Sequence, residues 1–223
     1  MQTSPPNSEQ ELLDRCRTIT GKTILELANI FNQKIPTTLH QAKGWIGTLI
    51  EWHLGADSAN KSQPDFSNLG IELKTLPLNA QYQPQESTYI CTASLNPNLE
   101  VWRTSRVYKK LAHVLWVPIE ASSQIPIPKR RIGTPILWKP CPKIETILKQ
   151  DWEELTEILQ LGQIAKLSAK QGTYLQIRPK AAHSHILTST LDEQGEVILT
   201  GPKGFYLRSV FTKIILANHY CIN

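Results

Sequence analysis

Apolar residues recur at helical spacing in the first quarter of the chain and give way to short strand-like runs near residue 70. Helical spacing, broken at Gly21, Pro36 and Gly55, predicts helices over residues 9–19, 24–31 and 42–54. Runs rich in β-branched or aromatic residues predict strands over residues 70–76, 88–94, 112–118 and 134–138. This order predicts an α/β fold in which a central mixed β-sheet is flanked by helices.

The second half of the chain returns to helical spacing. A long apolar stripe predicts a helix over residues 143–161, with the acidic face of Asp151-Trp152-Glu153-Glu154 turned to solvent. The pattern then predicts a strand over 174–177, a polar connection over 180–196, an extended segment over 204–207 and a helix over 210–217. No repeat interrupts this order, so we expect one domain over residues 1–223.

Size and composition exclude several classes of protein. With 223 residues, 40% of them hydrophobic and 19% charged, the chain is too apolar for a disordered protein and long enough to bury a core. Its near-apolar stretches are far shorter than the ~20 residues of a membrane span, and the N-terminus lacks the pattern of a secretory signal. Four cysteines without a Cys-x-x-Cys pair indicate reduced thiols. We therefore expect a cytoplasmic protein with no membrane segment.

The positive charge is concentrated in one segment. The whole chain has a net charge of +5, whereas residues 101–150 alone carry +8, from 10 basic and 2 acidic residues. Trp102, Tyr108 and Trp116 alternate with these cations, which is typical of a surface that meets phosphates. A solvated basic face has the same composition, so the sequence leaves both interpretations open.

Asp65, Glu72 and Lys74 form the most informative motif. Side chains alternate along a strand, so Glu72 and Lys74 share one face while Leu73 points to the other. The turn before this strand carries Asp65, a second carboxylate that can meet Glu72. Mg²⁺ takes about six oxygen ligands, one or two of them carboxylates. The motif predicts a Mg²⁺ site in which Lys74 orients or deprotonates an attacking water, and the alternative is a strand edge with ordinary charges.

Five runs of sequence, in order along nearly the whole chain, add a resemblance. They are Lys43-Gly44-Trp45-Ile46-Gly47, Asp65-Phe66-x-x-Leu69-Gly70-Ile71-Glu72-Leu73-Lys74-Thr75, Asp151-Trp152-Glu153-Glu154-Leu155, Leu175-Gln176-Ile177-Arg178-Pro179-Lys180 and Gly204-Phe205-Tyr206-Leu207. Together they resemble the MutH family of methyl-directed mismatch-repair endonucleases, members of the PD-(D/E)xK restriction-endonuclease-like nucleases. The resemblance implies a restriction-endonuclease-like fold with two lobes around a DNA cleft, an N-terminal catalytic lobe near residues 1–100 and a C-terminal DNA-reading lobe near residues 101–223.

The resemblance also implies roles for the acidic and basic residues. Asp65, Glu72 and Lys74 become the catalytic trio, with Asp65 and Glu72 as the metal ligands, and Glu51 and Lys110 become its outer members. Taken without the family, Glu51 is also consistent with a solvated position on the third helix. Lys109 is as well placed as Lys110 to contact a phosphate.

A further set of residues is implied to bind DNA: Lys43, Gly44, Tyr89, Arg178, Pro179, Lys180 and Tyr206. Arginine can bond guanine O6 and N7 together, and Pro179 favours an extended backbone that projects Arg178 from a loop. Tyr206 matches the tyrosine that senses adenine methylation, and Tyr89 stands where the family usually has phenylalanine. Without the family, the Arg-Pro-Lys run is also consistent with a basic turn and Tyr206 with a core residue.

The implied function is a Mg²⁺-dependent endonuclease that nicks the unmethylated strand of hemimethylated GATC DNA. It is expected to be a monomer that MutL activates after MutS finds a mismatch. One alternative is a GATC restriction endonuclease of related fold, which needs two active sites to cut both strands. Another is a catalytically silent DNA-binding module, against which the intact trio argues.

Overall fold

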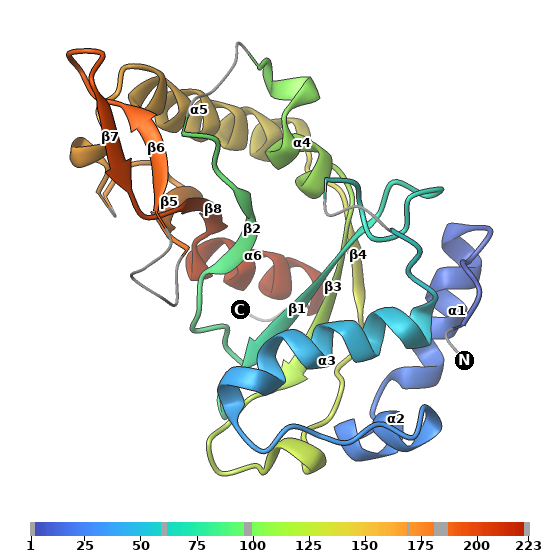
Figure 1. The fold of residues 1–223 in the computed structure, drawn as a ribbon. Coiled ribbons are helices and arrows are strands. Elements are labelled where there is room, and N and C mark those ends of the chain that lie inside the picture. The colour runs from blue at the N-terminus through green and yellow to red at the C-terminus, as the bar shows by residue number, and fades with distance from the viewer. Residues whose placement is uncertain (1–2, 59–61, 96–99, 169, 181–186, 221–223) are drawn as a thin grey trace. The chain divides into compact units, whose positions relative to one another are not determined.

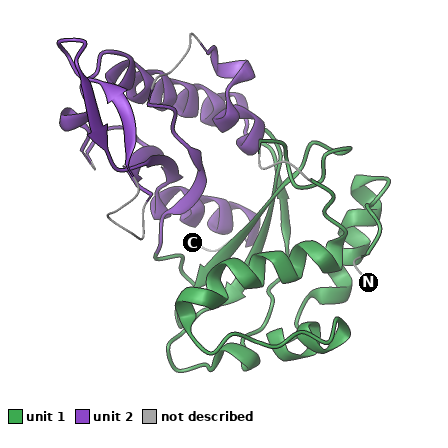
Figure 2. Ribbon diagram, in the orientation of Figure 1, with its two compact units in different colours: residues 1–85, 112–139 green, residues 86–111, 140–223 purple. Residues whose placement is uncertain are grey.

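The computed structural model describes all residues except 1–2, 59–61, 96–99, 169, 181–186 and 221–223 (Figure 1). The chain forms two compact units (Figure 2): unit 1 contains residues 1–85 and 112–139, and unit 2 contains residues 86–111 and 140–223. This division differs from two lobes that meet near residue 100. The difference arises because residues 112–139 return to pair with a strand of unit 1.

Three helices begin unit 1, and each starts at a hydroxyl side chain that accepts a hydrogen bond from a backbone amide of the first turn. They are α1 (Glu9–Ile19), α2 (Ile24–Ile30) and α3 (Leu39–Leu54), capped by Ser8, Thr23 and Thr38. The cap at Thr38 explains why α3 begins before the predicted residue 42. Gly55 ends α3 in the left-handed conformation, with φ of 82°.

A mixed three-stranded sheet packs against these helices (Figure 1). Its central strand β3 (Val114–Glu120) is parallel to β1 (Glu72–Leu78) and antiparallel to β4 (Ile136–Trp138). Leu73 and Leu115 lie on the face that joins the helices in one hydrophobic cluster. Glu72 and Lys74 alternate with Leu73 and therefore lie on the opposite face. The predicted mixed sheet flanked by helices is confirmed.

Unit 2 contains a second three-stranded sheet. Its central strand β8 (Lys203–Leu207) is antiparallel to β2 (Thr88–Thr92) on one side and to β5 (Leu175–Pro179) on the other. The prediction that the strand near residue 88 joins the central sheet is wrong, because its partner β8 comes from the far end of the chain. The predicted polar connection after β5 is also interrupted by a hairpin of β6 (Thr188–Leu191) and β7 (Val197–Thr200).

The helices of unit 2 are α4 (Arg106–Leu111), α5 (Pro142–Gln160) and α6 (Ser209–Tyr220). Short 3₁₀ turns complete the structure: η1 (Trp102–Thr104) and η3 (Ile164–Lys166) in unit 2, and η2 (Ile127–Lys129) in unit 1. Among the described residues, no helix is both long enough and apolar enough to cross a membrane.

Asp151 on α5 corrects another prediction. Its acidic run was expected to face solvent, but Asp151 itself is only 4% exposed. Its carboxylate accepts hydrogen bonds from the backbone amides of Thr173, Tyr174 and Leu175 at 2.7, 2.6 and 2.8 Å. Gly172 allows this close turn, because a Cβ there would lie 2.2 Å from the Leu175 carbonyl oxygen. Asp151 therefore fixes the start of β5.

We expect Asp151→Ala to destabilise the protein by roughly 3 kcal/mol, because it leaves three amide donors, one buried and two part-buried, without their acceptor. The measurement is urea unfolding followed by circular dichroism. Glu154→Ala, on an exposed position of the same helix, is the control and should change the free energy of unfolding by less than about 0.5 kcal/mol. Equal midpoints for the two variants would contradict the anchoring role.

Candidate functional site

A tight turn brings Asp65 beside the first residues of β1. The backbone groups of Phe66 and Ile71 hydrogen-bond each other, at N···O distances of 2.9 and 3.2 Å, so the intervening residues fold back on themselves. Gly70, at φ of +64°, takes the left-handed conformation that this turn needs. The Oδ2 atom of Asp65 then accepts the Leu73 amide hydrogen at 2.8 Å. The six residues between Asp65 and Glu72 therefore form a turn that places the Asp65 carboxylate beside the start of β1.

Glu72 and Lys74 meet on the face of β1 that points away from the helices. The Nζ atom of Lys74 donates a hydrogen bond to Oε1 of Glu72, and the two groups form an ion pair. The Glu72 side chain is 2% exposed and that of Lys74 15% exposed. A buried carboxylate needs a counter-charge, and the ammonium group supplies it. The structure thus brings the trio together, since Asp65 binds the amide of the residue between the other two.

Asp65 and Glu72 are the residues at this position that can hold a hard cation. Two carboxylates are the number that Mg²⁺ commonly takes from a protein. Among the described residues, no group of three or more His, Cys, Asp or Glu side chains is arranged to bind a metal ion. The two donors that Asp65 and Glu72 offer are carboxylate oxygens, which suit Mg²⁺ better than a metal that prefers nitrogen or sulfur ligands.

Glu51 lies near the end of α3 in the same unit and is half-buried. Its carbonyl accepts the amides of Gly55 and Ala56, both at 2.9 Å, and so begins the loop that follows α3. In that loop the Asp57 amide donates to the Asp65 carbonyl at 2.9 Å. The end of the Glu51 helix is therefore tied through backbone hydrogen bonds to the turn that carries Asp65. Lys43 and Gly44 are exposed further toward the start of α3.

Lys110 belongs to unit 2, at the end of α4, and not to the unit that holds the trio. It is 5% exposed, whereas the neighbouring Lys109 is exposed. The two lysines that the sequence left as alternatives therefore differ sharply in environment. The role of Lys110 at a phosphate stays a prediction.

One face of the β2–β8–β5 sheet collects four of the predicted DNA-binding side chains. Tyr89 on β2 is in register with Tyr206 on β8, and their rings meet edge to face with centroids 5.3 Å apart. The Arg178 guanidinium lies 5.8 Å from the centre of the Tyr206 ring, and the Lys180 ammonium 5.2 Å from that of Tyr89. We call these four residues the aromatic–cation cluster.

The backbone of Arg178 is part of a strand and not of a loop, which corrects the prediction. Arg178 and Pro179 are the last residues of β5, an edge strand, and both are exposed. The extended backbone expected before proline is present, but the pairing of Arg178 with Gly204 on β8 holds it in the sheet. Arg178 is therefore presented from a fixed strand end.

The environment of Tyr206 raises the pKa of its phenol. Burial is the largest cause, because it disfavours the phenolate, and the nearby Tyr89 acts in the same direction. Arg178 and Lys180 oppose the shift, since their positive charges favour the phenolate. Burial dominates, so Tyr206 presents a neutral hydroxyl at neutral pH.

Two residues of this face were missed from sequence. Thr92 on β2 lies with its hydroxyl oxygen 2.7 Å from Lys180 Nζ and 3.0 Å from the Tyr89 hydroxyl. Gly204 on β8 leaves the space that the two tyrosine rings occupy. Threonine at a strand end carries no distinctive sequence signal, whereas a glycine inside a strand pattern marks close approach of other groups.

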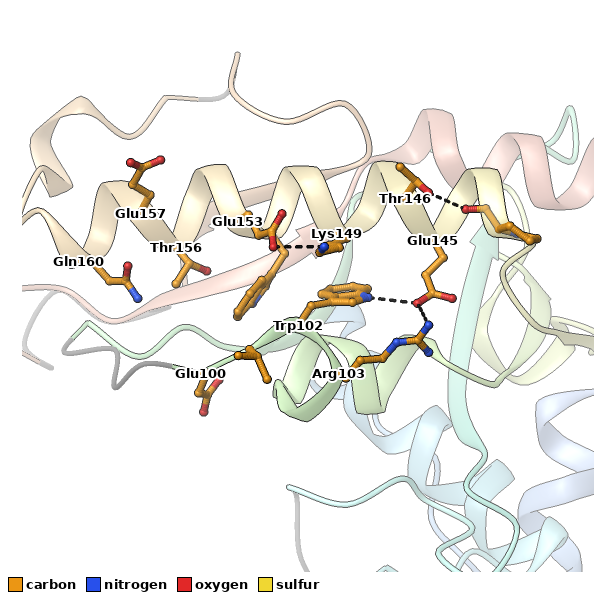
Figure 3. A pocket seen from close by; sticks show the side chains of 13 residues that line it. Glu100, Trp102, Arg103, Glu145, Thr146, Lys149, Glu153, Thr156, Glu157 and Gln160 are labelled. Carbon is orange, nitrogen blue, oxygen red and sulfur yellow. Dashed lines mark hydrogen bonds and ion pairs between the residues drawn. The ribbon is translucent and has the colours of Figure 1, made fainter.

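A hollow of about 870 Å³ between η1 and α5 contains none of the predicted site residues (Figure 3). At its edge, Glu145 accepts a hydrogen bond from the Trp102 indole at 3.3 Å and pairs with Arg103 at 2.9 Å. Arg130, in the same basic segment, is 8% exposed and bonds backbone carbonyls. Part of the charge excess over residues 101–150 therefore holds the fold together and does not form an open phosphate-binding surface.

The mixed α/β fold is that of a restriction-endonuclease-like enzyme. A family model described as "DNA mismatch repair enzyme MutH" matches residues 54–151, which include the trio. The DNA mismatch repair proteins MutH of Serratia proteamaculans and Escherichia coli are each 46% identical to this chain, and that of Yersinia enterocolitica is 44% identical. Each comparison covers 98% of this chain and 96% of the relative. The chain belongs to the MutH family of DNA mismatch repair enzymes.

The raised pKa of Tyr206 predicts that its phenol keeps its proton above pH 10, the ordinary value for tyrosine. In an alkaline titration, the difference in tyrosinate absorbance between the wild type and Tyr206→Phe should have its midpoint above that pH. The folded protein then binds more protons than the unfolded chain, so this group's contribution to stability falls as the pH rises past 10.

Arg178→Met provides a matched comparison for this titration. It removes a cation that lowers the Tyr206 pKa, so the Tyr206 step should move to still higher pH. Circular dichroism at each pH confirms that the protein stays folded. A Tyr206 step at or below pH 10 would contradict the prediction.

Proposed function

We propose that this protein is a Mg²⁺-dependent endonuclease that nicks the unmethylated strand of hemimethylated GATC duplex DNA. The observation that carries the proposal is the convergence of Asp65, Glu72 and Lys74 at the start of β1, through the Asp65–Leu73 hydrogen bond and the Glu72–Lys74 ion pair. Membership of the MutH family supports the same conclusion.

The reaction requires water to attack phosphorus while a P–O bond of the backbone breaks. Asp65 and Glu72 would hold Mg²⁺, which when bound would neutralise charge on the phosphate and acidify water. Lys74 can orient the attacking water, because its ammonium group lies beside Glu72. To act as the base it would first have to give up its own proton, since an ammonium group has no lone pair. Glu51 would help to position water, and Lys110 would contact the scissile phosphate. The departing oxygen must gain a proton, which balances the hydrolysis.

Recognition of GATC requires side chains that reach base edges, since phosphate contacts do not distinguish sequences. Arg178 and Lys180 are suited to hydrogen-bond guanine, and both are exposed at the end of β5. Tyr206 offers a neutral hydroxyl beside them, where an added N6-methyl group on adenine would change the contact. Lys43, Gly44, Tyr89 and Pro179 would complete the DNA contacts.

The biological setting is part of the same proposal. The enzyme would act as a cytoplasmic monomer, and a MutL partner would activate it after MutS has bound a mismatch. The described residues contain one trio, so a single chain is suited to cut one strand.

Glu72→Ala should lower the rate of nicking at least about 1000-fold, because it removes a metal ligand. The affinity for duplex DNA should stay within about threefold of that of the wild type, because Glu72 makes no DNA contact in the proposal. The assay follows supercoiled plasmid with one GATC site, with Mg²⁺ and with EDTA, and gel shift measures binding. Glu153→Ala, on the exposed face of α5, is the control and should nick normally.

The products of this plasmid assay separate the competing functions. Open circles from the wild type support nicking, whereas linear DNA as the first product would favour a restriction endonuclease. No Mg²⁺-dependent cleavage even with MutL present would favour a silent DNA-binding module. Undiminished cleavage by Glu72→Ala would exclude the assigned active site.

The methylation state of the substrate provides a separate prediction. Nicking should be fast on unmethylated and hemimethylated GATC duplexes, confined to the unmethylated strand of the latter, and at least about 100-fold slower on the fully methylated duplex. Oligonucleotides labelled on either strand measure this directly. Tyr206→Phe should reduce the discrimination more than it reduces the rate on unmethylated DNA. Equal rates on all three duplexes would exclude methylation sensing.

A further inference from the structure

Thr92 links two side chains that come from opposite edges of the unit 2 sheet. Tyr89 is carried by β2, whereas Lys180 directly follows β5, and β8 runs between these two edge strands. The Thr92 hydroxyl oxygen lies 2.7 Å from Lys180 Nζ and 3.0 Å from the Tyr89 hydroxyl. The Thr92 hydroxyl therefore contacts both side chains, and its contact with Lys180 crosses the central strand.

Gly204 makes this link possible. It is the β8 residue in register with Thr92 on one side and with Arg178 on the other. A Cβ at Gly204 would lie 2.9 Å from the Tyr89 ring and 3.2 Å from the Tyr206 ring. The absence of a side chain at this point lets the tyrosine rings lie over β8 and lets Lys180 reach Thr92 across it.

The direction of the hydrogen bonds follows from the chemistry of the groups. An ammonium group has only donors, so Lys180 donates to the Thr92 oxygen. That oxygen has a second lone pair and one hydrogen, and either serves the Tyr89 hydroxyl. The Lys180 ammonium also lies 5.2 Å from the centre of the Tyr89 ring. This cation–π contact also favours the position of Lys180 beside Thr92 and Tyr89.

The link would matter for DNA because Lys180 is otherwise an exposed, flexible side chain. Lysine is among the side chains that lose the most conformational freedom when they are ordered. A hydrogen bond already present in the free protein orders the Lys180 side chain before DNA binds. Less conformational entropy is then lost on binding, so the affinity for the correct site is higher. Thr92 has no charge and would not change the general attraction to phosphates.

We propose that Thr92 is a positioning residue for sequence reading: its hydroxyl pre-orients Lys180 and Tyr89 toward the DNA, while Gly204 leaves the space that the tyrosine rings need. This inference rests on the proposed function, in which Lys180 and Tyr89 contact the GATC duplex. It adds two residues, Thr92 and Gly204, that act through the aromatic–cation cluster and not by touching the reacting phosphate.

The test compares Thr92→Val, which keeps the shape but removes the hydroxyl, with Thr92→Ser, which keeps the hydroxyl. For each variant, nicking of a GATC duplex gives kcat and KM, and gel shift gives the affinity for GATC and for a duplex without GATC. Thr92→Val should lose about tenfold in the ratio of the two affinities, mainly through weaker GATC binding and a higher KM. Thr92→Ser should keep at least half of the wild-type ratio.

Coupling to Lys180 distinguishes positioning from a general structural role. After Lys180→Met, adding Thr92→Val should cost less than about twofold, because the group that the hydroxyl orients is gone. Gly204→Ala is a second, independent variant and should lower the same ratio by displacing the rings. Thermal unfolding shows whether each variant folds. If Thr92→Val does not fold, Gly204→Ala decides the outcome.

Several results would overturn the positioning role. One is an affinity ratio in Thr92→Val equal to that of the wild type, or the same result in Gly204→Ala if Thr92→Val does not fold. Another is a loss of the ratio in Thr92→Ser as large as that in Thr92→Val. A third is that Thr92→Val lowers the ratio as much in the Lys180→Met background as in the wild type. The wild type in the same assays separates this failure from a failure of the proposed function. If the wild type neither nicks nor prefers GATC, the proposed function itself is wrong. If it does both and Thr92→Val behaves alike, only the role of Thr92 is wrong.

Discussion

The buried pair of Glu72 and Lys74 is the interaction on which the candidate active site depends. A carboxylate that is 2% exposed is costly to keep ionised, and the ammonium two residues along the same strand face compensates it. The alternation of β1 forces this arrangement, because Leu73 between them is drawn into the helix-covered core. One face of the strand therefore holds the unit together, and the other carries the paired charges of Glu72 and Lys74.

The two compact units contain different parts of the chemistry. Unit 1 holds Asp65, Glu72, Lys74 and Glu51, while unit 2 holds Lys110 and the aromatic–cation cluster. Each set is fixed by its own sheet and by local anchors. Asp65 is held by the Leu73 amide, and the strand that presents Arg178 is held at its start by the buried Asp151. Each unit therefore holds its own part of the candidate site in place through contacts within that unit.

Much of the local structure was predictable from sequence because its causes are local. Glycine stops and apolar periodicity predicted the three helices of unit 1, with the start of α3 placed three residues too late. Errors arose where distant segments decide. The strand near residue 88 joins β8 and not the central sheet, and Asp151 leaves the acidic surface to bind three amides of another segment. Exposed and buried acids look alike in a sequence, because burial depends on which amides lie within reach.

The amino-acid sequence by itself determined the family, the trio and the alternation that puts Glu72 and Lys74 on one face, since each follows from residue identity and spacing. Only the tertiary structure decided which neighbours these residues meet. The link from Thr92 to Tyr89 and Lys180 is the clearest case, because it joins two edge strands across β8 and requires an empty position at Gly204. Contacts of this kind join residues far apart in the chain, and the pairing of strands that creates them depends on the whole fold.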